Sequence, residues 1–250
     1  MTIYPPIDWV KHPLHAAGAS GNRAEVERLI AAGADINQVL HLSVTGVGLA
    51  GTPLHVTLFS CGYGEYLYQG YHGVVEVLLA AGADVGLCRL WDGTPLHDAA
   101  RFGLTRVADM LVSHGADVNS RGDYLHRTPL HLAATYGRPS MVDFLLSRGA
   151  ELEPVAGGDN RDGARTSPYW RQYDTGGSRD YMLPRVPGTG TPLQMAARQG
   201  HAEVVRRLIE RGACLGIDTA IDMAAKARGL CQEQFDEVIT LLKEAQIGRV

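Results

Sequence analysis

The stretch TPLHDAARFG, residues 94–103, recurs along the chain with small changes and decides the fold prediction. Aligned on its proline, its further copies are HPLH (12–15), TPLH (52–55), TPLH (128–131) and TPLQ (191–194). The prolines are spaced by 40, 42, 34 and 63 residues, which indicates a basic period of about 33 residues with variable additions. A degenerate sixth copy begins at Thr219. Repetition at this period predicts an array of stacked units.

Each copy carries the local signals of a helical hairpin. Threonine at the N-cap accepts a hydrogen bond from the first free N–H groups, and the proline after it already has a helical φ. The small pair Ala99–Ala100 lets a neighbouring helix approach closely, and Gly103 then ends the first helix. A second helix carries the apolar pair Leu111–Val112 before Gly115, a left-handed cap residue. Because no copy can bury its apolar face alone, the copies are expected to stack.

The motif T-P-L-H-x-A-A, followed by Gly, V-V-x-x-L-L and G-A-D, resembles that of the ankyrin repeat family. The resemblance covers residues from about 12 to 246. It implies an all-α fold, an ankyrin-repeat solenoid of about six stacked helix–turn–helix units with hairpin fingers and a concave surface built from fingers and first helices. Within a single domain over 1–250, the predicted repeats are 12–37, 52–86, 94–119, 128–153, 191–216 and 218–246.

Several copies depart from the family pattern. His12 replaces the capping threonine, Gly18 and Thr57–Leu58 interrupt the small pair, and Gln194 replaces the repeated histidine. These changes affect the regularity of repeats 1 and 2 but not the fold prediction. The last copy has a shortened finger and a charged second helix, as expected of a terminal unit that faces water.

Three stretches are longer than a unit of about 33 residues allows. The finger at 38–51 gains about seven residues, the segment 61–73 gains about nine between two helices, and the finger at 154–188 gains about thirty. By the family geometry, the first and third additions project on the finger side. The second is expected at the opposite end of the helices.

The 154–188 loop differs from the repeats in composition. A loop of this length without secondary structure is usually functional or disordered. Its glycines and prolines favour disorder, whereas its aromatic and arginine residues are the types that dominate binding hot spots. Its mixture of Gly, Ser, Asn and Tyr also resembles an antibody paratope. We therefore predict a bound or self-docked loop whose contact residues are Tyr169, Trp170, Arg171 and Tyr173.

Aromatic and arginine residues also mark the predicted groove. In the ankyrin family, the two residues before the helix-ending glycine face the concave side, and the adjoining fingers border it. Packing between neighbouring helices is an alternative role for Phe59, Phe102 and Tyr136. The predicted groove residues are Phe59, Trp91, Asp98, Arg101, Phe102, Tyr124, His126, Tyr136 and Arg198.

The sequence contains no convincing motif for catalysis or cofactor binding. The histidines at 15, 55, 97 and 131 follow the repeat period, so they are predicted to hydrogen-bond between adjacent fingers. His12 and His15 are spaced i, i+3 without a third ligand nearby in sequence. GVGLAG (46–51) matches the letters of a dinucleotide-binding turn but lies outside a βαβ unit, and residues 158–169 lack two carboxylates of a calcium loop. No cofactor, metal ion or catalytic residue is expected.

The amino-acid composition argues against several classes of protein. Lys and Arg number 23 against 27 Asp and Glu, so the chain lacks the basic surplus of nucleic-acid-binding proteins. No stretch approaches the roughly 18 apolar residues of a membrane span, and the N-terminus lacks the features of a secretory signal. The four cysteines form no C-x-x-C pair and are expected to be reduced thiols. We expect a cytoplasmic monomer that binds neither nucleic acid nor membrane.

Together these features predict a non-catalytic protein–protein interaction module. It would bind a specific partner through its concave groove and the 154–188 loop. The alternative is a small-molecule-binding or catalytic ankyrin scaffold with the loop as a lid over the groove. In that alternative, the residues that converge beneath the lid would be Asp98, Arg101, His126, Tyr136 and Arg198. The fold does not identify the partner.

Overall fold

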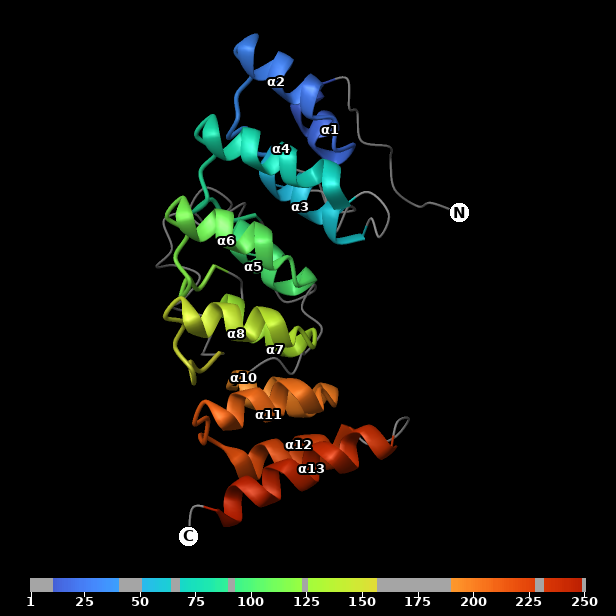
Figure 1. Ribbon diagram of the computed structural model, residues 1–250, viewed down its shortest axis with the longest axis vertical. Coiled ribbons are helices and arrows are strands. Elements are labelled where there is room, and N and C mark those ends of the chain that lie inside the picture. The colour runs from blue at the N-terminus through green and yellow to red at the C-terminus, as the bar shows by residue number, and fades with distance from the viewer. Residues whose placement is uncertain are drawn as a thin grey trace, which may run out of the picture. The chain divides into compact units, whose positions relative to one another are not determined.

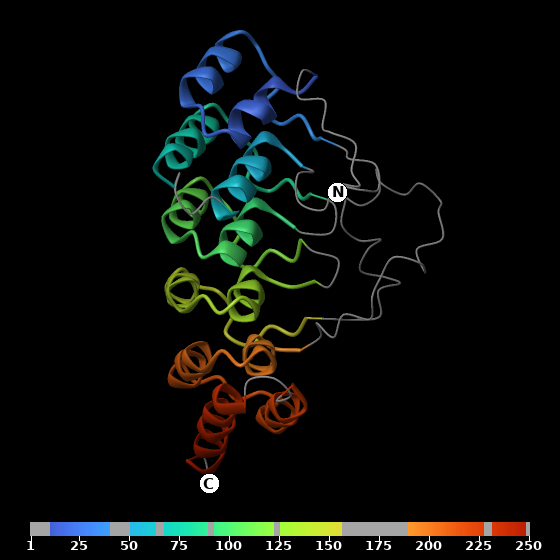
Figure 2. The same cartoon turned by 90° about the vertical axis from the view of Figure 1, so that its right-hand side faces the viewer.

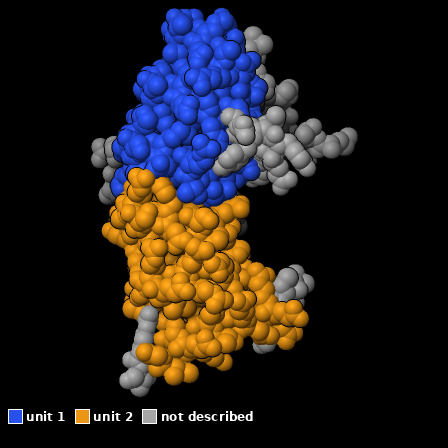
Figure 3. All heavy atoms as spheres, in the orientation of Figure 1, with its two compact units in different colours: residues 1–117 blue, residues 118–250 orange. Residues whose placement is uncertain are grey.

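The structure of the chain is a computed structural model. It describes residues 11–40, 51–63, 68–89, 93–122, 126–156, 190–227 and 232–248. The chain divides into two compact units, Met1–Asp117 and Val118–Val250 (Figure 3). Within the described ranges the regular structure is helical, with isolated β-bridges between finger residues and no strand. The predicted all-α fold class is therefore confirmed.

Unit 1 contains the first three helical hairpins. Their helices are α1 (Pro13–Ala19) and α2 (Arg23–Ala31), α3 (Pro53–Tyr63) and α4 (Tyr68–Ala80), and α5 (Pro95–Phe102) and α6 (Thr105–Ser113). The first helices α1, α3 and α5 contact one another in chain order, and so do the second helices α2, α4 and α6 (Figures 1 and 2). The unit is thus two layers of helices, with the fingers joining successive hairpins.

Unit 2 repeats the same arrangement. Its helices are α7 (Pro129–Thr135) and α8 (Pro139–Ser147), α10 (Pro192–Gln199) and α11 (Ala202–Glu210), and α12 (Ile217–Ala227) and α13 (Gln232–Ile247). α7, α10 and α12 contact in order, as do α8, α11 and α13. α12 begins at Ile217, two residues before the start expected from Thr219, because this copy lacks the proline that sets the first helical position in the others.

The repeated histidine joins each hairpin to the next finger. In unit 2, the backbone N–H of Thr128 donates to Nδ1 of His131 at 3.0 Å, and Nε2 of the same ring lies 3.0 Å from the carbonyl oxygen of Gly190. Because Nδ1 accepts, the ring proton is on Nε2 and is donated to the glycine. For His131 this confirms the predicted hydrogen bond to the next finger. The same connection links His15 to Gly51, His55 to Gly93, and Gln194 to Gly216.

Gly93, which precedes the capping Thr94, must be glycine for two reasons. Gly93 has a φ of 93°, a left-handed conformation that other residues rarely adopt. A Cβ atom there would lie only 2.8 Å from Cγ of His97. The close approach of backbone and imidazole ring leaves no room for a side chain.

A backbone bridge closes three of the fingers at the same place. Leu40 pairs with Gly51, Arg89 with Gly93, and Ala156 with Gly190. These bridges enclose residues 41–50, 90–92 and 157–189, which lie outside the described residues. Chain can therefore be added beyond the bridge while the histidine–glycine bonds between hairpins are kept. The position of the 38–51 and 154–188 additions on the finger side stays a prediction.

The addition at 61–73 lengthens helices as well as their connection. α3 has 11 residues and α4 has 13, against 8 in α5 and 9 in α6. α4 reaches back to the first hairpin, where the Tyr71 hydroxyl donates to the carbonyl oxygen of Ala19 at 2.9 Å. From the repeat length, these residues were predicted to lie between the two helices. Part of them is helical because the segment can pack on a neighbouring hairpin.

Two departures from the repeat pattern compensate each other. Thr57 of α3 occupies a position of the small pair, and Gly18 of α1 lies beside it. A Cβ atom at Gly18 would lie 2.5 Å from Oγ1 of Thr57. The missing side chain at Gly18 therefore makes room for the larger residue at position 57.

No helix among the described residues has the length and apolar character needed to cross a membrane.

Candidate functional site

Two phenylalanines predicted to line the groove contact each other in unit 1. Phe59 on α3 and Phe102 at the end of α5 meet edge to face, with ring centroids 5.9 Å apart and an interplanar angle of 85°. Both side chains are half-buried. This geometry is a favourable one for aromatic pairs, so the contact stabilises the packing of α3 against α5.

Phe102 also packs against the backbone of the lengthened hairpin. A Cβ atom added to Gly62 of α3 would overlap the Phe102 ring. Gly62 therefore lets the end of α3 cover part of this ring. For Phe59 and Phe102, the structure supports the alternative role of packing between neighbouring helices.

A buried ion pair lies beside these rings. Arg89 in the finger and Asp98 in the first turn of α5 approach to 2.6 Å, and each side chain is 1% exposed. The guanidinium carbon of Arg89 also lies 5.6 Å from the centroid of the Phe59 ring, within the range of a cation–π contact. We call Phe59, Arg89, Asp98 and Phe102 the Phe102 cluster.

The cluster changes the expected role of Asp98. Its carboxylate was predicted to face the groove, but it is buried and engaged by Arg89. Isolated buried charges are costly, whereas a paired charge can be accommodated. Any contribution of Asp98 to binding would therefore act through Arg89 and the finger that carries it. Sequence analysis did not single out Arg89.

Some of the remaining predicted contact residues lie within the described residues, and others lie outside them. Arg101 is half-buried on α5, next to Phe102. In unit 2, His126 is half-buried and has a φ of 54°, which is uncommon for a residue other than glycine. The predicted contact residues that lie outside the described residues are Trp91, Tyr124, Tyr169, Trp170, Arg171 and Tyr173.

Tyr136 is the aromatic residue that unit 2 presents at the end of a first helix. It follows α7 as its C-cap, its backbone N–H donates to the carbonyl oxygen of Leu132, and its side chain is 43% exposed. The preceding Thr135 is held by a hydrogen bond from its hydroxyl to His131 and by one from His201 to its own carbonyl oxygen. Tyr136 therefore projects from a well-anchored backbone.

Unit 2 carries further exposed or half-buried groups on its first helices and fingers. Arg198 lies half-buried on α10, which contacts α7. Val155 and Leu215 are apolar residues in successive fingers and are about half exposed. Between them, the Glu153 carboxylate accepts hydrogen bonds from the backbone N–H groups of Cys214 and Leu215. Sequence analysis did not identify Val155 or Leu215, because a single apolar residue in a finger carries no periodic signal.

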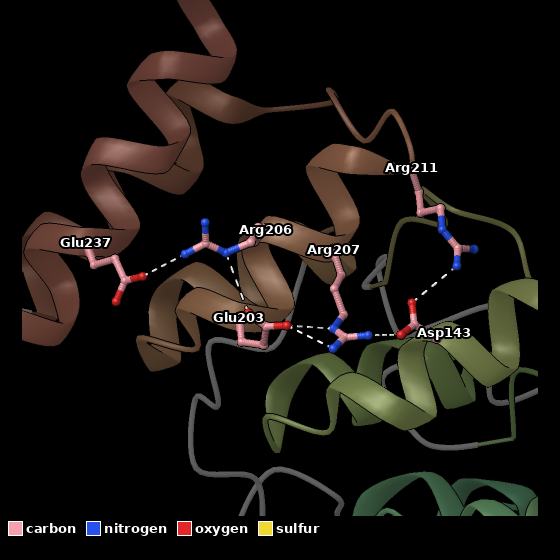
Figure 4. A network of polar contacts seen from close by, with 6 residues as sticks. All are labelled: Asp143, Glu203, Arg206, Arg207, Arg211 and Glu237. Carbon is pink, nitrogen blue, oxygen red and sulfur yellow. Dashed lines mark hydrogen bonds and ion pairs between the residues drawn. The ribbon is translucent and has the colours of Figure 1, made fainter.

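The second helices of unit 2 carry a network of charged residues instead (Figure 4). Asp143 of α8 forms ion pairs with Arg207 and Arg211. Arg206 of α11 forms an ion pair with Glu237 of α13, with a nitrogen–oxygen distance of 3.0 Å. Glu203 joins Arg206 to Arg207. The network links α8, α11 and α13 through charges that pair with one another. Each such exposed pair contributes little to stability.

Burial shifts the pKa values of Cys61 and His201. Burial raises the pKa of the Cys61 thiol to about 11, so this group is protonated at neutral pH and is a poor nucleophile. Burial also lowers the pKa of His201, a shift partly offset by its hydrogen bond to Thr135 and reinforced by the charge of Arg138. His201 therefore acts as a neutral donor to Thr135 at neutral pH.

Comparison with known protein families matches two parts of the chain. The family model of ankyrin repeats in three copies matches residues 65–155, and the model of the ankyrin repeat matches residues 190–220. Together these matches include the hairpins that carry Phe102, Tyr136 and Arg198.

Curated relatives show the same similarity. The chain is 36% identical over 116 residues to the rabbit (Oryctolagus cuniculus) ankyrin repeat and SOCS box protein 5, a match that covers 46% of this chain and 30% of that protein. It is 33% identical over 120 residues to the zebrafish (Danio rerio) ankyrin repeat and SOCS box protein 11, covering 48% of this chain and 35% of that protein. The chain thus aligns with about a third of the length of these relatives.

A solved structure extends the similarity to most of the chain. The crystal structure of the human ASB11 ankyrin repeat domain superposes with a TM-score of 0.62 over 93% of this chain and 83% of that chain, at 23% sequence identity. At this identity the likeness shows the fold, an ankyrin-repeat solenoid.

Proposed function

Because the chain belongs to the ankyrin repeat family, we propose that it binds one specific partner protein through its concave groove and the 154–188 loop. Binding proteins of this fold present variable side chains on a constant framework. The proposal makes the chain a non-catalytic module that acts as a monomer in the cytoplasm. Its repeats supply the framework, and the ends of the first helices, the fingers and the loop supply selectivity.

The exposure of Tyr136 carries the proposal. A tyrosine that is 43% exposed at a helix end offers a large apolar area together with a hydroxyl group, and tyrosine is enriched among binding hot spots. Its backbone is held by hydrogen bonds of α7 and by the contact of His201 with Thr135. A contact residue held in this way loses little conformational freedom when a partner binds.

Other residues of unit 2 support the same proposal. Val155 and Leu215 add exposed apolar area on the fingers of unit 2, and Arg198 contributes an arginine on the neighbouring first helix. On the second helices of the unit, by contrast, the prominent charged groups pair with one another. The distribution favours the first helices and fingers as the binding surface.

Site-specific crosslinking tests the proposed surface in cells. A photo-reactive phenylalanine analogue at position 136 should crosslink to one abundant partner. The matched control is the same analogue at Glu210, an exposed residue of the second helix α11, which should not crosslink to that protein. The partner found at 136 is then purified for affinity measurements.

Affinity measurements with that partner decide the proposal. Tyr136→Ala and Trp91→Ala should each weaken binding by about tenfold or more, the loss typical of a hot-spot residue, and deletion of 157–186 should weaken it further. Circular dichroism checks that each variant keeps its helices. If all three variants bind the partner with unchanged affinity, the proposed surface is wrong.

A further inference from the structure

The cap of the first repeat differs from the caps of the repeats that follow. At the threonine caps of repeats 2, 3 and 4, the backbone N–H of the threonine lies 3.0–3.3 Å from Nδ1 of the histidine three residues later. In repeat 1 the cap residue is His12, whose φ of −130° and ψ of 59° depart from the extended conformation of Thr94. The cap bond to the histidine ring is not made there.

Two imidazole nitrogens of this repeat have no hydrogen-bond partner among the described residues. They are Nδ1 of His12 and Nδ1 of His15, and both atoms are buried from solvent. The side chain of His15 is completely buried. Buried polar atoms nearly always have a partner, so an unpartnered pair requires an explanation.

The other nitrogen of His15 fixes its protonation state. Nε2 lies 3.2 Å from the carbonyl oxygen of Gly51, and a carbonyl oxygen only accepts hydrogen bonds, so Nε2 carries the proton. The lone pair is therefore on Nδ1. Histidines that bind metal ions usually donate their second ring N–H to a carbonyl or carboxylate oxygen in this way.

The separation of the two rings fits a shared ion. Their centroids are 5.6 Å apart and their planes make an angle of 81°. With metal–nitrogen bonds of about 2.1 Å and about 1.1 Å from nitrogen to ring centre, two imidazoles on one tetrahedral ion have centroids about 5 Å apart. The observed separation of 5.6 Å is close to this value.

We propose that His12 and His15 form a binding site for a divalent transition-metal ion of the kind that imidazole prefers, such as Zn²⁺, Ni²⁺ or Cu²⁺. No group of three or more potential metal ligands gathers among the described residues, so the two imidazoles are the ligands that the proposal takes from the described part of the chain. The positive end of helix α1 opposes a bound cation and should weaken its binding by up to about fivefold.

Metal titration of the purified full chain tests this site. Calorimetry with NiCl₂ at pH 7.5 should show one site, CuCl₂ should bind more tightly than NiCl₂, and MgCl₂ should not bind. The electron paramagnetic resonance spectrum of the Cu²⁺ complex should show coupling to two imidazole nitrogens. Absence of Ni²⁺ and Cu²⁺ binding would overturn the proposal.

The variant His12→Thr separates the metal site from the fold. It restores the threonine cap found in the following repeats, so it should keep or raise the unfolding temperature while weakening Ni²⁺ binding at least tenfold. His114→Ala removes an exposed histidine on another hairpin and should leave Ni²⁺ affinity unchanged. Equal Ni²⁺ affinity of wild type and His12→Thr would show that the ion binds elsewhere and would also overturn the proposal.

Discussion

Phe102 in unit 1 and Tyr136 in unit 2 occupy the same position in their repeats, directly before the glycine that follows the first helix. Phe102 is half-buried against Phe59 and the backbone of Gly62, whereas Tyr136 is 43% exposed. The difference does not come from the two aromatic residues. In unit 1 the first helix of the preceding hairpin, α3, is lengthened. It has a glycine, Gly62, at the place where the Phe102 ring packs.

The comparison shows that a position in the repeat is not by itself interior or surface. The neighbouring hairpin decides, because each hairpin buries its apolar face against the next one. In unit 1 the covered ring belongs to a cluster with a buried ion pair. In unit 2 the ring at the same position is more exposed, and the charged pairs lie on the second helices.

The largest expected effect distinguishes the buried ion pair of unit 1 from the exposed network of unit 2. Asp98→Ala leaves the charge of Arg89 buried without its carboxylate and should lower the free energy of unfolding by about 3–5 kcal/mol. Asp143→Ala removes an acceptor of two arginines but should cost only about 1 kcal/mol, because its partners are partly exposed to water. Urea denaturation followed by circular dichroism measures both changes.

The matched control replaces both charges at once. Arg89→Met with Asp98→Leu should recover most of the stability that Asp98→Ala loses, since apolar residues of similar volume often replace a buried pair without cost. Equal losses for Asp98→Ala and Asp143→Ala would contradict the distinction between the two units.

The next effect concerns the two aromatic residues directly. Phe102→Ala removes a half-buried ring and should lower the free energy of unfolding by about 2 kcal/mol, less than the cost at a fully buried site. Tyr136→Ala should change it by no more than about 0.5 kcal/mol. The same denaturation experiment compares them, and a larger loss for Tyr136→Ala would reverse the assignment of core and surface.

Two glycines of the lengthened hairpin provide the control for this comparison. Gly62→Ala should cost about 1–3 kcal/mol, because the added methyl group overlaps the Phe102 ring. At Gly70 a Cβ atom would lie 3.5 Å from the carbonyl oxygen of Gly21, an ordinary contact. Gly70→Ala should therefore be neutral or stabilise the protein by up to about 1 kcal/mol through its helix propensity.

The smallest expected effect is a pH dependence at the residue that anchors the backbone before Tyr136. Burial lowers the pKa of His201 in the folded protein below its ordinary value of about 6.5. The unfolded chain therefore takes up a proton first as the pH falls, so this contribution to stability is complete above about pH 6.5 and declines below it.

Unfolding temperatures at pH 7.5 and 5.5 measure this contribution. The wild type should lose more stability between these values than His201→Gln, which retains a donor for Thr135 but does not titrate in this range. An NMR titration of His201 that gave a pKa above about 6.5 would contradict the prediction.

Much of the fold could be predicted from local patterns. The threonine–proline start, the small pair and the closing glycines each act within one hairpin, and the period of the histidines correctly indicated their hydrogen bonds between fingers. The Arg89–Asp98 pair also left a signal. Asp98 stands where the other copies have Ala16, Val56, Leu132 and Met195, and Arg89 stands where two fingers have Leu40 and Ala156. One copy thus has opposite charges at two otherwise apolar positions.

The predicted site was harder to judge for a physical reason. The burial of the Phe102 ring depends on Gly62. The burial of the Asp98 carboxylate depends on its ion pair with Arg89, which lies in a finger of different length from its neighbours. These contacts join residues of different hairpins, or of a finger and a helix, and their strength depends on the surrounding packing.

Helix starts, helix ends and the stacking order follow from the amino-acid sequence alone, because capping and backbone conformation involve residues a few positions apart. The division between core and surface at equivalent positions required the three-dimensional arrangement. Burial is a property of the neighbouring hairpins, and a change in the length of one of them alters the environment of an unchanged residue in the next.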